Sequence, residues 1–223
     1  MKKMMFCLFV MIFLSPHLVF AQPSNYVEFG VNYSSFRTEG GKSEPGLTIG
    51  FGKNYYPIQN FNGFFGFDVR YVRKRILLEN KRWPSGFDPS NADLMIGDIK
   101  SDISFLDLPI RFGYSMQIRK SFNISLQTGA SLSIPIKNHT KLKSLKIIQL
   151  GSEERGSVEF DYILWDIHGV KGSIDLQYSI ALIFRSAVLR FFYSHALTAT
   201  EGFTDLMISD KLDSFHISFG YVF

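Results

Sequence analysis

Apolar and polar residues alternate with a period of two along most of this chain. In residues 26–35, Val27, Phe29, Val31 and Tyr33 fall on one side of an extended segment, and glycine, serine, asparagine and glutamate fall on the other. Successive side chains of a β-strand point to opposite faces of the sheet. The pattern therefore predicts a strand with one apolar and one polar face.

Seven more segments repeat this alternation and predict seven more strands. They cover residues 46–55, 63–75, 102–116, 122–135, 170–184, 187–196 and 213–223. A tilted strand of about ten residues is long enough to cross a bilayer. The connections alternate in length: those near 36–45, 76–101, 137–169 and 197–212 are long and polar, and those near 56–62, 117–121 and 185–186 are short.

These features predict an all-β fold, an eight-stranded antiparallel up-and-down transmembrane β-barrel with short periplasmic turns and long outer loops. A soluble lipocalin-like barrel is the alternative, since its strands also alternate. The polar faces favour the membrane barrel because they are rich in Gly, Ser, Asn and Gln and poor in Lys, which suits a narrow lumen. Ten strands are possible, because residues 142–150 and 157–165 are typical of a hairpin. We expect that hairpin to stand above the membrane as part of the third outer loop.

The amino-terminal residues have the features of an export signal. Two lysines precede a short apolar run, and residues 19–21 have the small-residue spacing of a cleavage site. We therefore expect residues 1–21 to be a signal peptide and residues 22–223 to be the barrel domain. The only cysteine, Cys7, falls within the signal, so the exported chain would have no thiol for disulfides, catalysis or metal binding.

Composition and charge narrow the class of protein further. The 223 residues are 46% hydrophobic, 16% aromatic and 20% charged, which excludes a disordered chain. Without the two signal lysines, the excess of Lys and Arg over Asp and Glu falls from four to two, too small to indicate nucleic-acid binding. The sequence after the signal has no apolar run long enough for a membrane helix, and it has no metal-ligand cluster or nucleotide fingerprint. We expect no cofactor and no metal.

The last strand resembles the carboxy-terminal assembly signal of bacterial outer-membrane barrels. Phe223 ends the chain, and Tyr221 and Phe219 precede it at intervals of two. The resemblance implies that these three residues engage the barrel assembly machinery during insertion. The physical basis is that an edge strand offers unpaired N–H and C=O groups to a template strand.

A larger part of the chain, about residues 22–223, resembles the PorT-like (porin family) outer-membrane β-barrels, which are similar in architecture to the OmpA and OmpX barrels. Residues 105–110 (Phe-Leu-Asp-Leu-Pro-Ile) resemble that family's aromatic-Leu-acid-apolar-Pro-apolar strand. Residues 189–198 resemble its Arg-x-x-Tyr-x-x-Gly-Leu segment, with His195-Ala196 where the family has glycine. The resemblance implies a bacterial outer-membrane location and specifies a fold better than an activity.

Charged residues on the polar faces are the first candidates for a functional site. They are Glu28, Asp68, Arg70, Asp107, Arg111, Asp175 and Arg190. An eight-stranded barrel is just wide enough for side chains to fill, and a buried ion without a partner is costly. We therefore expect ion pairs to plug the lumen, with Asp68, Arg70, Arg111 and Asp175 in one network. A narrow ion path is the alternative.

The predicted outer loops supply the second set of candidates. Their many cations, Lys74 among them, are expected to contact phosphates of lipopolysaccharide and other outer-membrane lipids. The alternative is a surface that binds an extracellular ligand, which the sequence does not identify. The candidates for that surface are Trp83, Phe87, Lys141, Lys143 and Trp165.

Enzymatic chemistry has weaker support. His168 and His216 fall near the outer ends of predicted strands, as the histidine of a lipid A hydrolase would, but no Gly-x-Ser-x-Gly motif is present. We expect no enzyme, and we treat these histidines as ordinary rim residues. The sequence favours a small integral outer-membrane protein of structural or binding type. A narrow pore or transport accessory is the alternative, and a lipid A hydrolase is the third class.

Overall fold

The computed structural model describes residues 24–37, 42–56, 62–84, 94–148, 162–166, 172–199 and 211–223, with the backbone alone for 80–84, 94–97, 99, 140–148 and 162–166. The regular secondary structure in these ranges is β-strand only, joined by turns. The strands are β1 (Ser24–Phe36), β2 (Lys42–Tyr55), β3 (Gly63–Pro84), β4 (Leu94–Arg119), β5 (Phe122–Ile148), β6 (Tyr162–Asp166), β7 (Ser173–Phe184), β8 (Ala187–Ala196) and β9 (Leu212–Val222). In the described ranges, no helix has the length and hydropathy needed to span a membrane.

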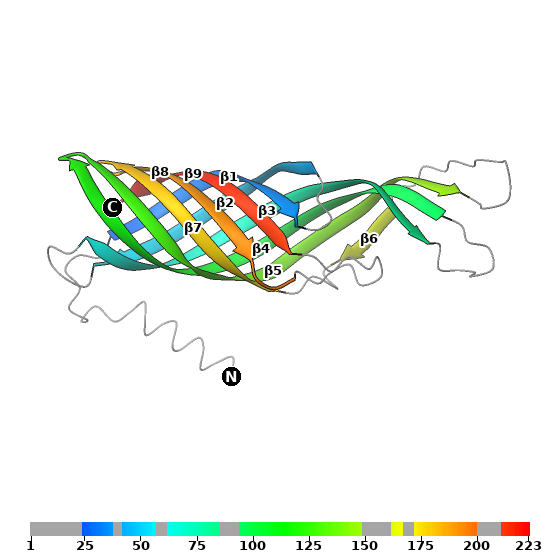
Figure 1. The fold of residues 1–223 in the computed structure, drawn as a ribbon, viewed down its shortest axis with the longest axis horizontal. Coiled ribbons are helices and arrows are strands. Elements are labelled where there is room, and N and C mark those ends of the chain that lie inside the picture. The colour runs from blue at the N-terminus through cyan, green and yellow to red at the C-terminus, as the bar shows by residue number, and fades with distance from the viewer. Residues whose placement is uncertain are drawn as a thin grey trace, which may run out of the picture.

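Eight of the strands close into a cylinder. The hydrogen-bonded order is β4-β3-β2-β1-β9-β8-β7-β5, and a further pairing between β4 and β5 closes the ring (Figure 1). All pairings are antiparallel. The predicted eight-stranded antiparallel barrel is confirmed.

The short strand β6 lies outside this ring. It pairs with residues 139–142 of β5, whereas β7 pairs with residues 122–133 of the same strand. The first arm of the predicted hairpin is thus the outer continuation of β5, and the second arm contributes β6. Neither arm adds a strand to the closed ring, so the ten-stranded alternative does not apply to the part of the chain that the structure describes.

Three strands run much further outward than the sequence predicted. β3 continues to Pro84, β4 begins at Leu94, and β5 continues to Ile148, so much of the expected outer loops 76–101 and 137–169 is strand (Figure 1, right-hand end). The alternation persists there: Ile76 and Leu78 on β3 are buried. Arg73 and Arg75 place charges on the outward face without ending the strand, and this is why the sequence pattern alone placed the boundary too early.

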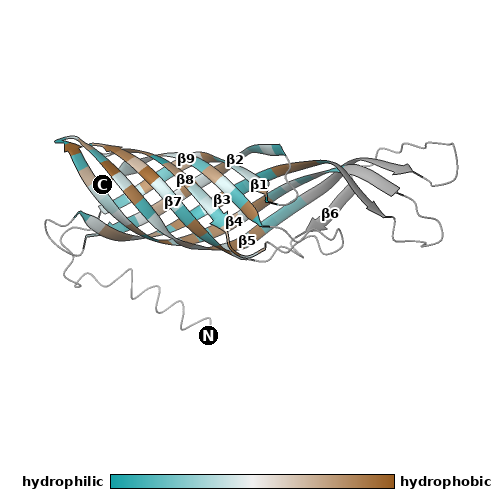
Figure 2. Ribbon diagram, in the orientation of Figure 1, coloured by the Kyte–Doolittle hydropathy of each residue, from teal (hydrophilic) through white to brown (hydrophobic). Residues whose placement is uncertain are grey.

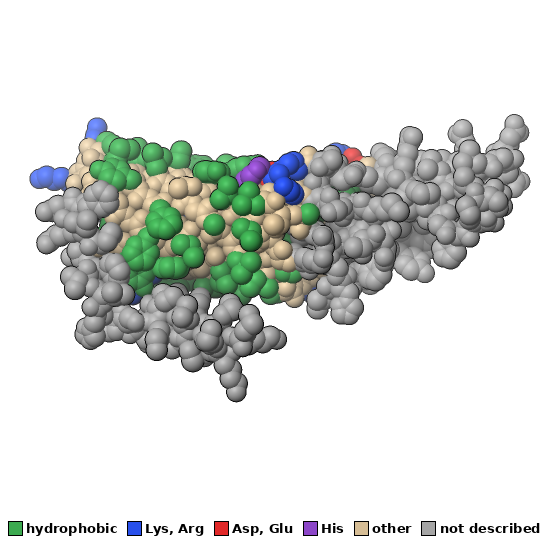
Figure 3. Space-filling model, turned by 60° about the horizontal axis from the view of Figure 1, so that its bottom comes forward, with side chains coloured by type: hydrophobic (Ala, Val, Ile, Leu, Met, Phe, Trp, Pro, Cys, Tyr) green, Lys and Arg blue, Asp and Glu red, His purple; other side chains and the backbone are tan. Residues whose placement is uncertain are grey.

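The wall of the barrel is apolar outside and polar inside. On β1, Phe29 is 57% exposed while its neighbour Glu28 is 4% exposed; on β9, Phe219 is 67% exposed while Ser218 is fully buried. Figure 2 shows this alternation along the strands, and Figure 3 shows apolar side chains spread over the outer wall. A soluble barrel would bury its apolar face, so that alternative is excluded.

The two described ends of the chain lie at the end of the barrel with the short turns. The backbone groups of Asn25 and Phe223 exchange hydrogen bonds of 3.1 and 2.9 Å there. At the same end a two-residue turn joins β7 to β8, and Arg185 adopts a φ of 55° in it. We take this end as periplasmic, as in outer-membrane barrels generally. The predicted signal peptide, residues 1–21, lies outside the described residues.

Candidate functional site: the polar lumen

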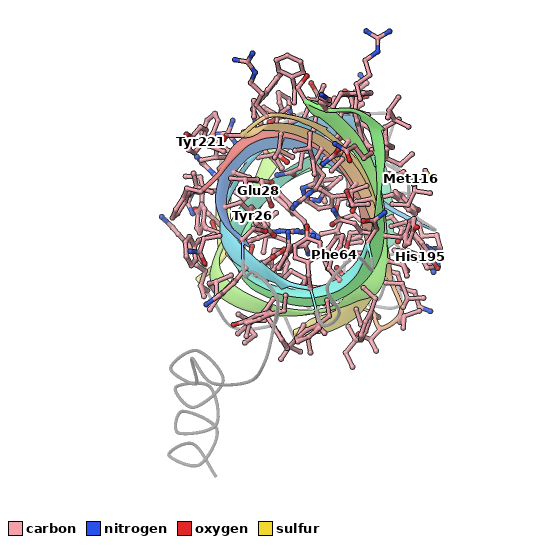
Figure 4. The ribbon with its side chains drawn as sticks, turned by 90° about the vertical axis from the view of Figure 1, so that its left-hand side faces the viewer. Tyr26, Glu28, Phe64, Met116, His195 and Tyr221 are labelled. Carbon is pink, nitrogen blue, oxygen red and sulfur yellow. The ribbon has the colours of Figure 1, made fainter. Side chains whose placement is uncertain are left out.

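Glycines on the inner wall make room for large charged side chains. A Cβ atom on Gly52 would lie 2.2 Å from Asp68 Oδ1 and 2.4 Å from Tyr26, and one on Gly66 would lie 2.6 Å from Asn54 Oδ1. These glycines come from β2 and β3, where they alternate with apolar outward residues. Figure 4 shows side chains filling the interior, with Tyr26 pointing inward.

Five charged residues form what we call the guanidinium network: Glu28, Asp68, Arg70, Arg111 and Arg190. Asp68 binds both Arg70 and Arg111, the latter with an N–O distance of 2.6 Å. Glu28 binds Arg190 at 2.7 Å and Arg70 at 2.9 Å. The Arg70–Glu28 contact lacks the alignment of a hydrogen bond and is an ion pair only. Each of the five residues is at most 4% exposed, so each carboxylate is held between two guanidinium groups away from water.

Neutral polar and aromatic side chains complete the coordination of this network. The Tyr26 hydroxyl donates to Asp68 and accepts from Arg111 and Arg190. The Arg190 and Arg111 guanidinium groups lie 4.7 and 5.3 Å from the centre of the Tyr26 ring, within cation–π range. Gln177 accepts a 3.0 Å hydrogen bond from Arg70. Buried charges that are paired and hydrogen-bonded in this way rigidify a core.

Further outward, Asp175 sits in a different environment, which we call the serine–carboxylate cluster. Its carboxylate accepts hydrogen bonds from Ser173 at 2.8 Å, Ser194 at 2.9 Å and Ser133 at 3.3 Å. Asp107 on β4 is the cross-strand partner of Ser133 and faces the same space. Asp175 and Asp107 are 0% and 2% exposed.

The predicted four-residue network is therefore joined only in part. Asp68, Arg70 and Arg111 are linked by ion pairs, whereas Asp175 makes hydrogen bonds to serines and no ion pair among the described residues. The reason is register: on the lumen wall Asp175 faces Ser131 of β5, and its β8 partner is Ala196. The spacing of residues along one strand does not reveal these cross-barrel neighbours.

Two buried lumen residues were expected near the outer rim. Lys74 falls within the predicted strand 63–75 but was counted among the cations of the outer loops; it is 2% exposed, and its Nζ lies 5.1 Å from the ring centre of Phe105. His216, predicted at the rim, is 1% exposed and stacks on Phe192 with ring centres 3.9 Å apart. Both residues occupy the alternate positions of their strands that face the lumen. This alternation is the sequence feature that could have predicted their burial. The His216 ring nitrogens hydrogen-bond Thr48 and a neighbouring serine, each at 3.0 Å.

Apolar side chains line the lumen beyond the charged region at both ends. Toward the outside they form what we call the outer apolar layer, whose members are at most 2% exposed: Phe36, Ile76, Leu78, Ile103, Phe105 and Leu212. Toward the periplasm, Phe64 and Val188 are 5% and 7% exposed. Figure 4 shows Phe64 pointing into the barrel from that end. The charged groups are thus enclosed between two apolar layers.

A polar cluster at the outer rim joins β1, β8 and β9. Asp213 pairs with Arg37 at 2.6 Å and accepts hydrogen bonds from the Tyr193 hydroxyl at 3.0 Å and the Ala196 N–H at 2.9 Å. Because Asp213 precedes the apolar outward residues that begin at Phe215, it lies outside the membrane-spanning segment. Burial raises the pKa of Asp213, but the hydrogen bonds from Arg37, Ala196 and Tyr193 outweigh it and lower that pKa. Figure 3 shows basic and histidine side chains at this edge of the apolar wall.

The remaining sequence candidates fall into two groups. Phe219, Tyr221 and Phe223 lie on or directly after β9 and are 56–67% exposed on the outer wall. The loop candidates lie outside the described residues (Phe87) or have only their backbone described: Trp83 in β3, Lys141 and Lys143 in β5, and Trp165 in β6.

Residues 20–205 match the family described as outer membrane protein beta-barrel domain. The chain belongs to this family. It is therefore a small β-barrel of the bacterial outer membrane. No curated protein matches it.

Several solved structures are similar to the chain at low sequence identity. Neisserial surface protein A has 14% identity and a TM-score of 0.39, covering 90% of this chain and 95% of its own. Ail, the attachment invasion locus protein of Yersinia pestis, has 14% identity and a TM-score of 0.35, covering 91% and 99%. The translocator domain of the autotransporter NalP from Neisseria meningitidis has 9% identity and a TM-score of 0.30, covering 100% and 95%.

Proposed function

We propose that this outer-membrane barrel has a structural or binding role and does not conduct. Its lumen is plugged by ion pairs, and its outer loops are available for interactions at the cell surface. The observation that carries the proposal is the enclosure of the guanidinium network, with Arg70 and Arg111 each 1% exposed. An ion path needs continuous water, and this network leaves its charges no contact with it.

Opening such a lumen would require breaking several ion pairs together. Arg70 bridges Glu28 and Asp68, so moving its guanidinium group leaves two buried carboxylates short of a partner. Removing one member of a buried pair is destabilising by about 3–5 kcal/mol. Thermal fluctuations therefore open this plug rarely, which supports a closed barrel over a pore.

The outer rim supports contact with lipid phosphates. The side chains of Arg37, Arg73 and Arg75 are 34%, 39% and 36% exposed beyond the apolar outward residues. Guanidinium groups form strong bidentate hydrogen bonds with phosphates. We propose lipopolysaccharide and outer-membrane lipid as partners of this rim, and the barrel assembly machinery as the partner of the last strand during insertion.

We also propose that the chain is PorT-like and has no enzymatic step. The motif at residues 105–110 forms part of β4, with Asp107 in the lumen and Ile110 46% exposed on the outer wall. Against catalysis, the His216 imidazole is enclosed between Phe192 and its hydrogen-bond partners, where no lipid substrate reaches it. The position of the motif supports the PorT-like assignment, and the enclosure of His216 supports the absence of an enzymatic step.

Planar-bilayer recording tests the closed lumen. We expect the purified folded protein to give no stable single-channel steps. A double variant, Glu28→Ser with Arg70→Ser, removes the central ion pairs and serves as the matched comparison, in which we expect current to appear. Steady openings of the unmodified protein would overturn the proposal.

A further inference from the structure

The four buried carboxylates of the lumen differ in their ion pairs. Glu28 and Asp68 are each paired with two guanidinium groups. Asp107 and Asp175 are as deeply buried, yet neither makes an ion pair with any described residue. A buried carboxylate without a counter-charge is strongly disfavoured. Each of these two groups therefore needs either a proton or a positive charge beside it.

The two carboxylates flank one strand and face a common space. Asp107 is the cross-strand partner of Ser133 on one side of β5, and Asp175 is the partner of Ser131 on the other. Ser133 also donates to Asp175 at 3.3 Å. Asp107 Oδ1 and Ser131 Oγ are both buried and have no hydrogen-bond partner in the structure. Two unused oxygen atoms thus lie on the same stretch of wall as two carboxylates.

The Lys74 ammonium group acts electrostatically on Asp107 but does not form an ion pair with it. Lys74 Nζ lies over the Phe105 ring in the outer apolar layer and is not within 4.0 Å of a carboxylate among the residues described. The three arginines of the lumen are already committed to Glu28 and Asp68. Lys74 and Arg70 act on Asp107 only from beyond ion-pair distance. No described side chain therefore forms an ion pair with Asp107 or Asp175.

We propose that the serine–carboxylate cluster binds a hard divalent cation, and that its physiological ion is Ca²⁺. Asp107 and Asp175 would supply the charged ligands, and Ser131 and Ser133 neutral oxygens. Ca²⁺ accepts six to eight oxygen ligands in flexible geometry, whereas Mg²⁺ requires a near-ideal octahedron. Among the described residues, no three His, Cys, Asp or Glu side chains are placed together to hold a metal ion. The proposed site therefore depends on the serine hydroxyl groups to complete the shell. This inference adds a ligand to the lumen and does not depend on the conductance of the barrel.

Calcium content after refolding provides the test, because an enclosed ion would be trapped as the barrel forms. The full chain is refolded from denaturant into detergent micelles with CaCl₂, with MgCl₂, or with EGTA, at matched ionic strength. Folded protein is separated by gel filtration into metal-free buffer, and bound metal is measured by elemental analysis. Heat-modifiable migration on a gel gives the apparent unfolding temperature of each sample.

We expect about one calcium per folded chain, no retained magnesium, and an unfolding temperature higher in calcium by about 5–10 °C at a hundredfold excess over Kd. Asp107→Asn should fold and lose the ion, because the carboxamide keeps the shape without the charge. The control Asp102→Asn, at the outer rim, should retain it. The proposal is overturned if the unmodified chain holds no stoichiometric calcium, if Asp107→Asn retains it, or if Asp107→Asn is the more stable chain whatever the metal, which would indicate a protonated carboxyl group instead.

Discussion

Asp68 on β3 and Arg111 on β4 meet inside the barrel, with a carboxylate oxygen 2.6 Å from a guanidinium nitrogen and both side chains at most 2% exposed. Asp68→Asn keeps the shape of the side chain and removes the charge that Arg70 and Arg111 share. We expect a loss of about 3–5 kcal/mol in the free energy of unfolding, because two buried guanidinium groups lose their common partner. Denaturant titration of the refolded barrel in micelles measures it.

Asp102→Asn is the matched control for this prediction. Asp102 pairs with Arg73 at the outer rim, where the two side chains are 19% and 39% exposed. An exposed ion pair contributes about 0–1 kcal/mol. If both variants lose the same stability, the guanidinium network is not what holds the lumen together.

Gly52→Ala tests how tightly the inner wall is packed. The added Cβ would lie 2.2 Å from Asp68 Oδ1 and 2.4 Å from Tyr26, and both of those side chains are fixed by ion pairs or hydrogen bonds. Overpacking of this kind costs about 1–3 kcal/mol, which the same titration detects. At Gly50 the nearest atoms are side-chain carbons 3.0 Å away, so Gly50→Ala should lose less. Equal stability of Gly52→Ala and the unmodified chain would contradict the packing described.

The pH dependence of stability should show the contribution of Asp213. Its pKa in the folded barrel lies below the ordinary value of 3.8, so its stabilising effect is complete above that value and is lost as pH falls through the lower folded pKa. The unmodified chain should therefore exceed Asp213→Asn in unfolding temperature by a constant margin between about pH 7 and pH 5. The margin should shrink below about pH 4. A margin that grew on acidification would reverse the sign assigned here.

Phe223 should matter for assembly through its backbone as well as its ring. Deleting Phe223 removes both hydrogen bonds to Asn25 at the seam between β1 and β9, whereas Phe223→Tyr keeps them. We expect the deletion to lower the amount of heat-modifiable barrel in outer-membrane fractions far more than Phe223→Tyr does. If the two variants lose similar amounts of heat-modifiable barrel, the contribution of Phe223 to assembly comes from its ring alone.

The alternation of side chains was sufficient to predict the barrel and to predict that its outer face is apolar and its inner face polar. Adjacent residues such as Glu28 and Phe29 separate to opposite sides of the wall, as their parity requires. The same parity identified Asp68, Arg70 and Arg111 as lumen residues. What a single strand cannot encode is which residues meet across the barrel, because that depends on the stagger of all eight strands. This is why Asp175 was placed in the wrong group.

Errors in strand length have a different physical origin. The outward faces beyond the apolar wall carry charged residues such as Arg73 and Asp102, so the sequence there resembles a loop on one face and a strand on the other. Lys74, although it shares the polar face of its predicted strand, was counted with the loop cations, and His216 was expected at the rim, because a basic residue near a presumed loop is usually solvated. Reading each face separately would have kept Ile76 in β3 and Lys74 in the lumen.

The most direct test of a closed polar lumen compares neighbouring positions on β9. Ser218 is fully buried inside and Phe219 is 67% exposed outside. In a Cys7→Ser background, Ser218→Cys and Phe219→Cys are reconstituted in bilayers and treated with a water-soluble thiol reagent and with a lipid-soluble maleimide, and Asp213→Cys at the rim gives the rate for an exposed site. We predict that cysteine at position 218 reacts with neither reagent until the barrel is unfolded, while cysteine at position 219 reacts with the lipid-soluble one. Modification at position 218 by the water-soluble reagent at the rate of the rim site would contradict the account, because it would require a water-filled lumen.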